Sequence, residues 1–155
     1  MKATPLSTPL RVLVVDDWPD TAESMAVLLR LWGHDVRIAH DGPTALAVAA
    51  LYRPDVVLLD VGLPCMDGYQ VARRLRNDLR LRDAFVVSLT GYGQDSDLWR
   101  SREAGCDRHL LKPVDPEVLE RLLASRKEAR HEETELPVPA FERRSLVSLP
   151  VKLSV

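Results

Sequence analysis

The sequence has no long hydrophobic run, no large excess of one charge and few cysteines. No run of about 18 apolar residues occurs, and the opening MKATPLSTPLR lacks the apolar segment of a secretion signal. The formal net charge of −2 does not favour nucleic acid or an anionic membrane as a partner. Two cysteines, Cys65 and Cys106, are too few for a disulfide framework and suit a reducing compartment. We therefore expect a soluble, cytoplasmic protein.

Five short apolar segments, rich in Val, Ile and Leu, alternate with stretches of helical periodicity. The segments are residues 10–15, 35–39, 55–59, 84–89 and 107–111. Between the first two, Met25, Leu28 and Leu29 recur at the spacing of one helix face. Because the segments are apolar at successive positions, they are typical of a parallel sheet covered by helices on both sides. The pattern predicts an α/β fold with a doubly wound, five-stranded parallel sheet and five helices.

The alternation does not extend over the whole chain. A length of 155 residues is enough for one domain with a sizeable core. We expect an N-terminal extension over residues 1–8, one domain over residues 9–127, and a C-terminal tail over residues 128–155 without an output domain. The tail contains several prolines and no sustained period, which favours a segment without a fold of its own over a docking segment.

Polar residues stand where four of the five predicted strands end. Asp16 and Asp17 follow the first strand, Asp60 follows the third, and Thr90 and Lys112 follow the fourth and fifth. The carboxyl ends of parallel strands share one edge of a sheet, where ligands bind. Clustered carboxylates repel each other unless a hard divalent cation such as Mg²⁺ lies among them. A carboxylate can also attack phosphorus, and phosphoryl transfer needs cations and hydrogen-bond donors against the phosphoryl oxygens.

Four stretches of the sequence resemble the receiver domain of two-component response regulators. They are VLVVDD, DVVLLDVGLPCMDGYQVARRLR, VVSLTGYG and AGCDRHLLKPV, and the resemblance covers residues 9–127. It implies a flavodoxin-like fold with strand order 2-1-3-4-5. It also implies a stand-alone regulator that switches conformation on phosphorylation, then binds a protein partner or relays the phosphoryl group. The implied donor is a sensor histidine kinase or a phosphotransfer protein.

The resemblance assigns the acceptor and a metal site. Asp60 would accept the phosphoryl group, in a self-catalysed reaction on the protein itself rather than as an enzyme acting on a separate substrate. Asp17 and Asp60 would bind Mg²⁺ directly, and Asp16 through water. The backbone carbonyl of Gly62 would complete the protein ligands.

The resemblance also assigns the residues that stabilise the phosphoryl group and transmit the signal. Lys112 would pair with Asp60 and then with the phosphoryl group, and a cis peptide would join it to Pro113. Thr90 would bind a phosphoryl oxygen and move inward, while His109 would turn into the space that Thr90 leaves. The family usually has Tyr or Phe at the position of His109. The histidine therefore either alternates between two orientations or simply fills an aromatic position.

Several alternatives share parts of this pattern. The chain can be a receiver module excised from a hybrid histidine kinase or a larger regulator, or a pseudo-receiver that binds proteins without phosphorylation. A phosphohydrolase of the dehalogenase type would need an Asp-x-Asp pattern after the first strand, which Asp16-Asp17-Trp18 lacks. A flavin-binding protein would repel its anionic phosphate with the same two acids. The arginines of residues 73–83 alternate with acids, which favours a solvated helix face over direct nucleic-acid binding.

Overall fold

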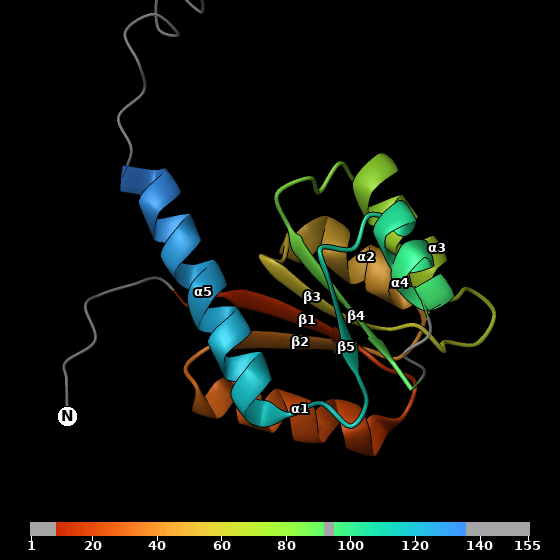
Figure 1. Ribbon diagram of the computed structural model, residues 1–155, viewed down its shortest axis with the longest axis horizontal. Helices are drawn as coiled ribbons and strands as arrows, with labels where there is room; N and C mark the ends of the chain where they lie inside the picture. The colour runs from red at the N-terminus through yellow and green to blue at the C-terminus, as the bar shows by residue number, and fades with distance from the viewer. Residues whose placement is uncertain (1–8, 92–94, 136–155) are drawn as a thin grey trace, which may run out of the picture. The chain divides into compact units, whose positions relative to one another are not determined.

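Five parallel strands form the central layer of the fold, and five helices alternate with them along the chain (Figure 1). The computed structural model describes residues 9–91 and 95–135. The strands are β1 (Arg11–Val15), β2 (Asp35–Ala39), β3 (Val56–Asp60), β4 (Phe85–Thr90) and β5 (Arg108–Leu111). They are hydrogen-bonded in the order β2-β1-β3-β4-β5, and all pairs are parallel. The predicted flavodoxin-like topology is confirmed.

The helices begin and end near the signals in the sequence. They are α1 (Pro19–Leu31), α2 (Gly42–Tyr52), α3 (Gly68–Asn77), α4 (Asp95–Ala104) and α5 (Pro116–Glu135). At the start of α3, the Asp67 side chain accepts a hydrogen bond from the Gln70 amide, and the Gln70 side chain accepts one from the Asp67 amide. This reciprocal pair satisfies backbone donors that a helix start leaves open. None of the described helices is long and apolar enough to cross a membrane.

The sheet has a hydrophobic core on each face, because successive strand residues point to opposite sides. Figure 1 shows α1 and the first turns of α5 on one side, with α2, α3 and α4 on the other. The side of α1 and α5 buries Val12, Val14, Val56, Leu58, Val87, Leu89, Ala22, Ala26, Leu29, Leu119 and Leu123. The other side buries Leu13, Val15, Val57, Leu59, Val86, Ala45, Ala49, Val71, Ala72 and Leu75. Two-sided burial explains why the central strand β3 is apolar at every position before Asp60, whereas the edge strands β2 and β5 also carry charged residues.

Helix α5 continues beyond the predicted end of the domain. Residues 128–135, which we expected in an unstructured tail, extend the helix to Glu135. The apolar periodicity fades there, but most of these residues are Glu, Ala and Arg, which have high intrinsic helix propensity. The chain divides into two compact units between Leu123 and Ala124, within this helix. The predicted extension of residues 1–8 and the tail beyond residue 135 lie outside the described residues.

Arg76 near the end of α3 is not the solvated side chain that the charge pattern predicted. Its side chain is only 16% exposed. Its guanidinium donates hydrogen bonds to the carbonyl oxygens of Leu81 and Ala84 at 2.7 Å and of Gly105 at 3.0 Å. It also pairs with the Asp107 carboxylate at 2.8 Å. A single arginine therefore ties α3 to the connection before β4 and to the turn between α4 and β5, because a guanidinium offers five donors in one plane.

We predict that Arg76→Ala lowers the free energy of unfolding by about 2–3 kcal/mol, because partly buried carbonyl and carboxylate groups lose a charged donor. Urea unfolding measures this change. Arg73→Ala, on the exposed face of the same helix, is the matched control and should change stability by less than about 0.5 kcal/mol. Equal effects of the two substitutions would contradict the anchoring role of Arg76.

Candidate functional site

Three carboxylates converge at the carboxyl edge of the sheet, as the sequence predicted. Asp16 and Asp17 directly follow β1, and Asp60 ends the neighbouring strand β3. One oxygen of each carboxylate lies within 4.8 Å of an oxygen of the other two. Asp16 and Asp60 are buried and Asp17 is half-buried. The arrangement concentrates negative charge at a site with little access to water.

Lys112 is the cation that lies against this cluster. Its Nζ atom is 3.2 Å from Oδ1 of Asp60 and 3.4 Å from Oδ2 of Asp16. The Lys112 amide donates to the Thr90 carbonyl at 2.7 Å, and the peptide bond to Pro113 is cis. Three carboxylates and one ammonium leave a formal charge of −2. A hard divalent cation bound by carboxylate oxygens would balance this charge, so the residues present fit Mg²⁺.

Asp16 is held in place by contacts that the sequence did not reveal. Its Oδ1 atom accepts a hydrogen bond from the Trp18 amide at 2.9 Å, which leaves Oδ2 toward Lys112. Its carbonyl oxygen lies 2.9 Å from Nδ1 of His40, so this ring nitrogen is the donor. His40 directly follows β2, the one strand end that we did not include in the predicted site. Its position at a strand end was the signal that could have identified it.

Asp60 also lines a second part of the site, which is a pocket of about 360 Å³. The pocket is lined by Asp60, Val61, Gly62, Asp67, Tyr69, Thr90, Gly91, Asp97, Arg100 and Lys112. The sequence predicted Gly62, Thr90 and Lys112 here, and the structure brings them together around Asp60. Whether the Gly62 carbonyl binds metal stays a prediction.

Tyr69, Asp97 and Arg100 form one wall of this pocket and were not predicted. The Tyr69 ring is buried, and its hydroxyl donates to the Asp97 carbonyl at 3.3 Å. The Arg100 guanidinium lies 5.0 Å from the centre of the Tyr69 ring, within the range of a cation–π contact. Burial raises the pKa of Tyr69, and the nearby Asp97 raises it further. The wall therefore presents a neutral phenol and a guanidinium beside the carboxylates.

The loop after Asp60 depends on a glycine at the start of α3. A Cβ atom on Gly68 would lie 2.6 Å from the Asp60 carbonyl oxygen and 2.8 Å from Cα of Val61, closer than real Cβ contacts. The Gly68 amide also donates to the Val61 carbonyl at 3.1 Å. Gly62 has no such constraint, because a Cβ there would be 3.8 Å from the Asp60 carboxylate. Gly68 thus allows the start of α3 to lie close against the backbone of Asp60 and Val61. The amide of Gly62 donates a hydrogen bond to Oδ1 of Asp60 at 3.1 Å.

The two predicted switch residues lie on neighbouring strands. Thr90 is the buried last residue of β4, and His109 lies in β5. The His109 ring points inward, with Nδ1 at 3.0 Å from the Ser88 hydroxyl. Alternation of His109 between two orientations stays a prediction.

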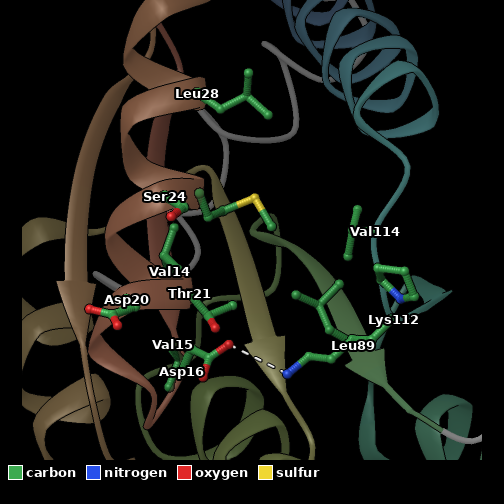
Figure 2. Close-up of a pocket in the computed structure, with 12 residues that line it drawn as sticks. Val14, Val15, Asp16, Asp20, Thr21, Ser24, Leu28, Leu89, Lys112 and Val114 are labelled. Atoms are coloured by element: carbon green, nitrogen blue, oxygen red, sulfur yellow. Dashed lines mark hydrogen bonds and ion pairs between the residues drawn. The ribbon is translucent and has the colours of Figure 1, made fainter.

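A larger and mostly apolar pocket of about 430 Å³ adjoins the acidic cluster (Figure 2). It is lined by Val14, Val15, Asp16, Asp20, Thr21, Ser24, Met25, Leu28, Leu89, Lys112, Pro113 and Val114. Figure 2 shows the Asp16–Lys112 ion pair at one end of this pocket and Leu28 at the other. The pocket therefore extends from apolar side chains of α1 to Lys112, the lysine that contacts Asp60.

The sequence matches a family model over most of its length. Residues 12–124 match the response regulator receiver domain. The chain is 39% identical over 107 residues to the DNA-binding dual master transcriptional regulator RpaA of Synechocystis, covering 69% of this chain and 44% of RpaA. It is 36% identical over 110 residues to Protein PilH of Pseudomonas aeruginosa, covering 70% of this chain and 90% of PilH. The chain thus spans less than half of RpaA and most of PilH.

Solved structures of the same kind share the fold. A CheY-like response regulator receiver domain protein from Methanospirillum hungatei superposes with a TM-score of 0.74 and 27% identity, covering 81% of this chain and 99% of that one. Chemotaxis protein CheY4 of Vibrio cholerae superposes with a TM-score of 0.72 and 29% identity, covering 76% of this chain and 98% of that one.

We predict that Mg²⁺ raises the midpoint of thermal unfolding, because a cation that binds only the folded cluster stabilises it by mass action. The gain reaches about 2.7 kcal/mol at a hundred times the dissociation constant. Asp17→Asn removes one carboxylate and should reduce the shift, whereas Asp20→Asn, exposed on α1 outside the cluster, should retain it. Thermal melts over a series of millimolar MgCl₂ concentrations test this. An absent shift in the wild type, or an equal shift in Asp17→Asn, would contradict the site.

Proposed function

The chain belongs to the response regulator receiver domain family, and on this basis we propose that it accepts a phosphoryl group on Asp60 in two-component signalling. The observation that carries the proposal is the contact of Lys112 with Asp60 at 3.2 Å, within a cluster of three carboxylates. Asp60 is buried and ends a central strand, so its carboxylate is fixed with respect to the lysine. The phosphodonor would be a sensor histidine kinase or a phosphotransfer protein.

In the proposed reaction a carboxylate oxygen of Asp60 attacks the phosphorus of a phosphohistidine. A phosphorus–oxygen bond forms, the phosphorus–nitrogen bond breaks, and the donor histidine leaves. Lys112 offsets the negative charge of the phosphoryl oxygens, and the Gly62 amide orients the Asp60 side chain. Asp16, Asp17, Asp60 and the Gly62 carbonyl would hold Mg²⁺, which when bound neutralises and orients the phosphoryl oxygens. Self-catalysed hydrolysis of the acyl phosphate would return the protein to its resting state.

The proposed switch begins at Thr90. Its side chain lines the same pocket as Asp60, at the end of the neighbouring strand. We infer that its hydroxyl donates to a phosphoryl oxygen and moves toward Asp60, and that His109 responds. One charge-assisted hydrogen bond is worth about 1.5–3 kcal/mol, which shifts a balanced pair of conformations about tenfold or more.

Two surfaces near the site fit two kinds of protein partner. The apolar pocket beside α1 would receive apolar side chains of the phosphodonor, because it ends at Lys112 next to the acceptor. On the other side, α4 and β5 expose Leu98, Trp99 and Leu111, at 40%, 64% and 53%. Exposed apolar side chains on adjacent elements favour protein contact. A downstream partner that binds α4 and β5 would therefore sense changes in the switch.

The share of each relative that this chain covers differs widely, so the activities of the whole relatives are not carried over to it. The chain covers 90% of PilH, but only 44% of RpaA and 24% of the response regulator PleD of Caulobacter vibrioides. We therefore do not extend DNA binding, which the name of RpaA states, to this chain. A receiver excised from a hybrid kinase remains the second candidate. A pseudo-receiver is disfavoured because the acidic cluster and Lys112 are all present.

We predict that acetyl phosphate with Mg²⁺ adds one phosphoryl group to the wild type and none to Asp60→Asn, which lacks the nucleophilic carboxylate. Intact-protein mass spectrometry detects the addition. Asp78→Asn, at the end of α3 away from the cluster, should be labelled like the wild type. Equal labelling of Asp60→Asn would exclude Asp60 as the acceptor, and full labelling in EDTA would exclude the metal requirement.

We predict that Thr90→Ala still accepts the phosphoryl group but transmits the signal poorly, because the chemistry occurs at Asp60 and the hydroxyl acts on the switch. Backbone amide NMR of phosphorylated protein would show smaller shifts in β5 and α4 than in the wild type. Thr90→Ser retains the hydroxyl and should restore most of the response. Full shifts in Thr90→Ala would show that the hydroxyl does not transmit the signal.

A further inference from the structure

Two buried serines and a histidine form a hydrogen-bonded group between β4, β5 and α4. The Ser88 hydroxyl lies 2.7 Å from the Ser101 hydroxyl on α4 and 3.0 Å from Nδ1 of His109 on β5. Ser88 is fully buried and Ser101 is 2% exposed. Ser88 and His109 are also direct partners in the pairing of the two strands. The group, which we call the serine–histidine cluster, therefore joins one helix to two adjacent strands.

The serine–histidine cluster lies next to Thr90. Residues two apart in a strand point to the same face, so Ser88 and Thr90 share the face of β4 that α3 and α4 cover. No step of the proposed phosphoryl transfer uses either serine. Ser88 of the cluster is thus two positions along β4 from the residue proposed to start the switch, on the same side of the sheet.

The inward orientation of His109 rests on one of its two ring nitrogens. Nδ1 contacts Ser88, whereas Nε2 is buried and has no hydrogen-bond partner among the described residues. A buried polar atom without a partner is unfavourable, so Nε2 opposes the inward orientation while the Ser88 contact supports it. Because these two contributions oppose each other, loss of the Ser88 hydroxyl should change the ratio of inward to outward orientations of the His109 ring.

The surroundings leave the ring room to move. A cavity of about 150 Å³ adjoins it, lined by Leu98, Ser101, Arg102, Cys106, Asp107, Arg108 and His109. Burial raises the pKa of the Cys106 thiol, which therefore remains a neutral neighbour. Ser88 has further contacts with Ser101 and with the Arg108 carbonyl at 3.3 Å, so its hydroxyl stays bonded if the ring turns away.

We propose that Ser88 is a positioning residue that holds His109 inward before phosphorylation, and that Ser101 fixes the Ser88 hydroxyl for this contact. The consequence for phosphorylation rests on the proposed function. If phosphorylation of Asp60 favours the inward ring, then an interaction that already favours the inward ring promotes phosphorylation by at most the same equilibrium factor, and by less where the inward ring already predominates. The unphosphorylated protein is therefore biased toward its activated arrangement.

The orientation of the ring can be tested without phosphorylation. NMR contacts between the His109 ring and the Cβ protons of residue 88, which both serine and alanine carry, report the inward orientation. Ser88→Ala should lower the ratio of inward to outward ring about two- to tenfold, the effect of one neutral hydrogen bond. Ser101→Ala should lower it less, because Ser88 keeps its contact with the ring. A ring that stays inward in Ser88→Ala would overturn the proposal.

A double-mutant cycle tests the consequence for phosphorylation. Ser88→Ala should reduce the steady-state extent of labelling by acetyl phosphate by no more than this factor, and should have no such effect in a His109→Phe background. An equal reduction in both backgrounds would mean that Ser88 only fills a buried position, and would overturn its positioning role. If the wild type takes no phosphoryl group, the proposed function fails, and the NMR contacts alone decide whether Ser88 positions His109.

Discussion

Repulsion among three carboxylates is the constraint on which the rest of this structure depends. The pairing of β1 with β3 brings Asp16, Asp17 and Asp60 together, and the burial of Asp16 and Asp60 reduces the screening of their charges by water. Lys112 offsets part of the charge, and it reaches the cluster because β5 ends at the same edge of the sheet. Lys112 and Asp16, which are 96 positions apart in the chain, therefore form an ion pair that reduces the repulsion among the carboxylates.

The supports of Asp60 are mainly backbone groups. Gly68 allows α3 to begin against the backbone of the acceptor strand, and the Val61 amide continues the pairing with β4 through the Leu89 carbonyl. On the opposite side of the cluster, the His40 ring holds the Asp16 carbonyl. A carboxylate supported in this way keeps its orientation when its charge changes, as phosphoryl transfer to it would require.

The fold could be predicted from the sequence because its signals are local. Apolar segments of fixed length, helix-ending glycines and polar strand ends each occupy a few adjacent positions. The contacts of Arg76, Tyr69 and Ser88 were not predictable in this way, because each depends on which residues the fold brings near them. Arg76 lies among alternating basic and acidic residues, a pattern typical of a solvated helix face. Its carbonyl acceptors come near it only because α3 packs against the connection before β4 and the α4–β5 turn. The continuation of α5 through residues 128–135 was not predictable from apolar periodicity, because helix propensity rather than that periodicity favours its last turns.

The order of strands gives Asp60 and His109 different numbers of neighbouring strands. β3, which ends at Asp60, has a hydrogen-bonded neighbour on both sides and is buried at every residue. β5, with His109, is an edge strand with one neighbour, and its residues are all partly or fully exposed. Local opening costs less where fewer contacts are broken, so the amide protons of β5 should exchange with solvent far faster than those of β3. On this basis, we expect the centre of the sheet to open less readily than its β5 edge.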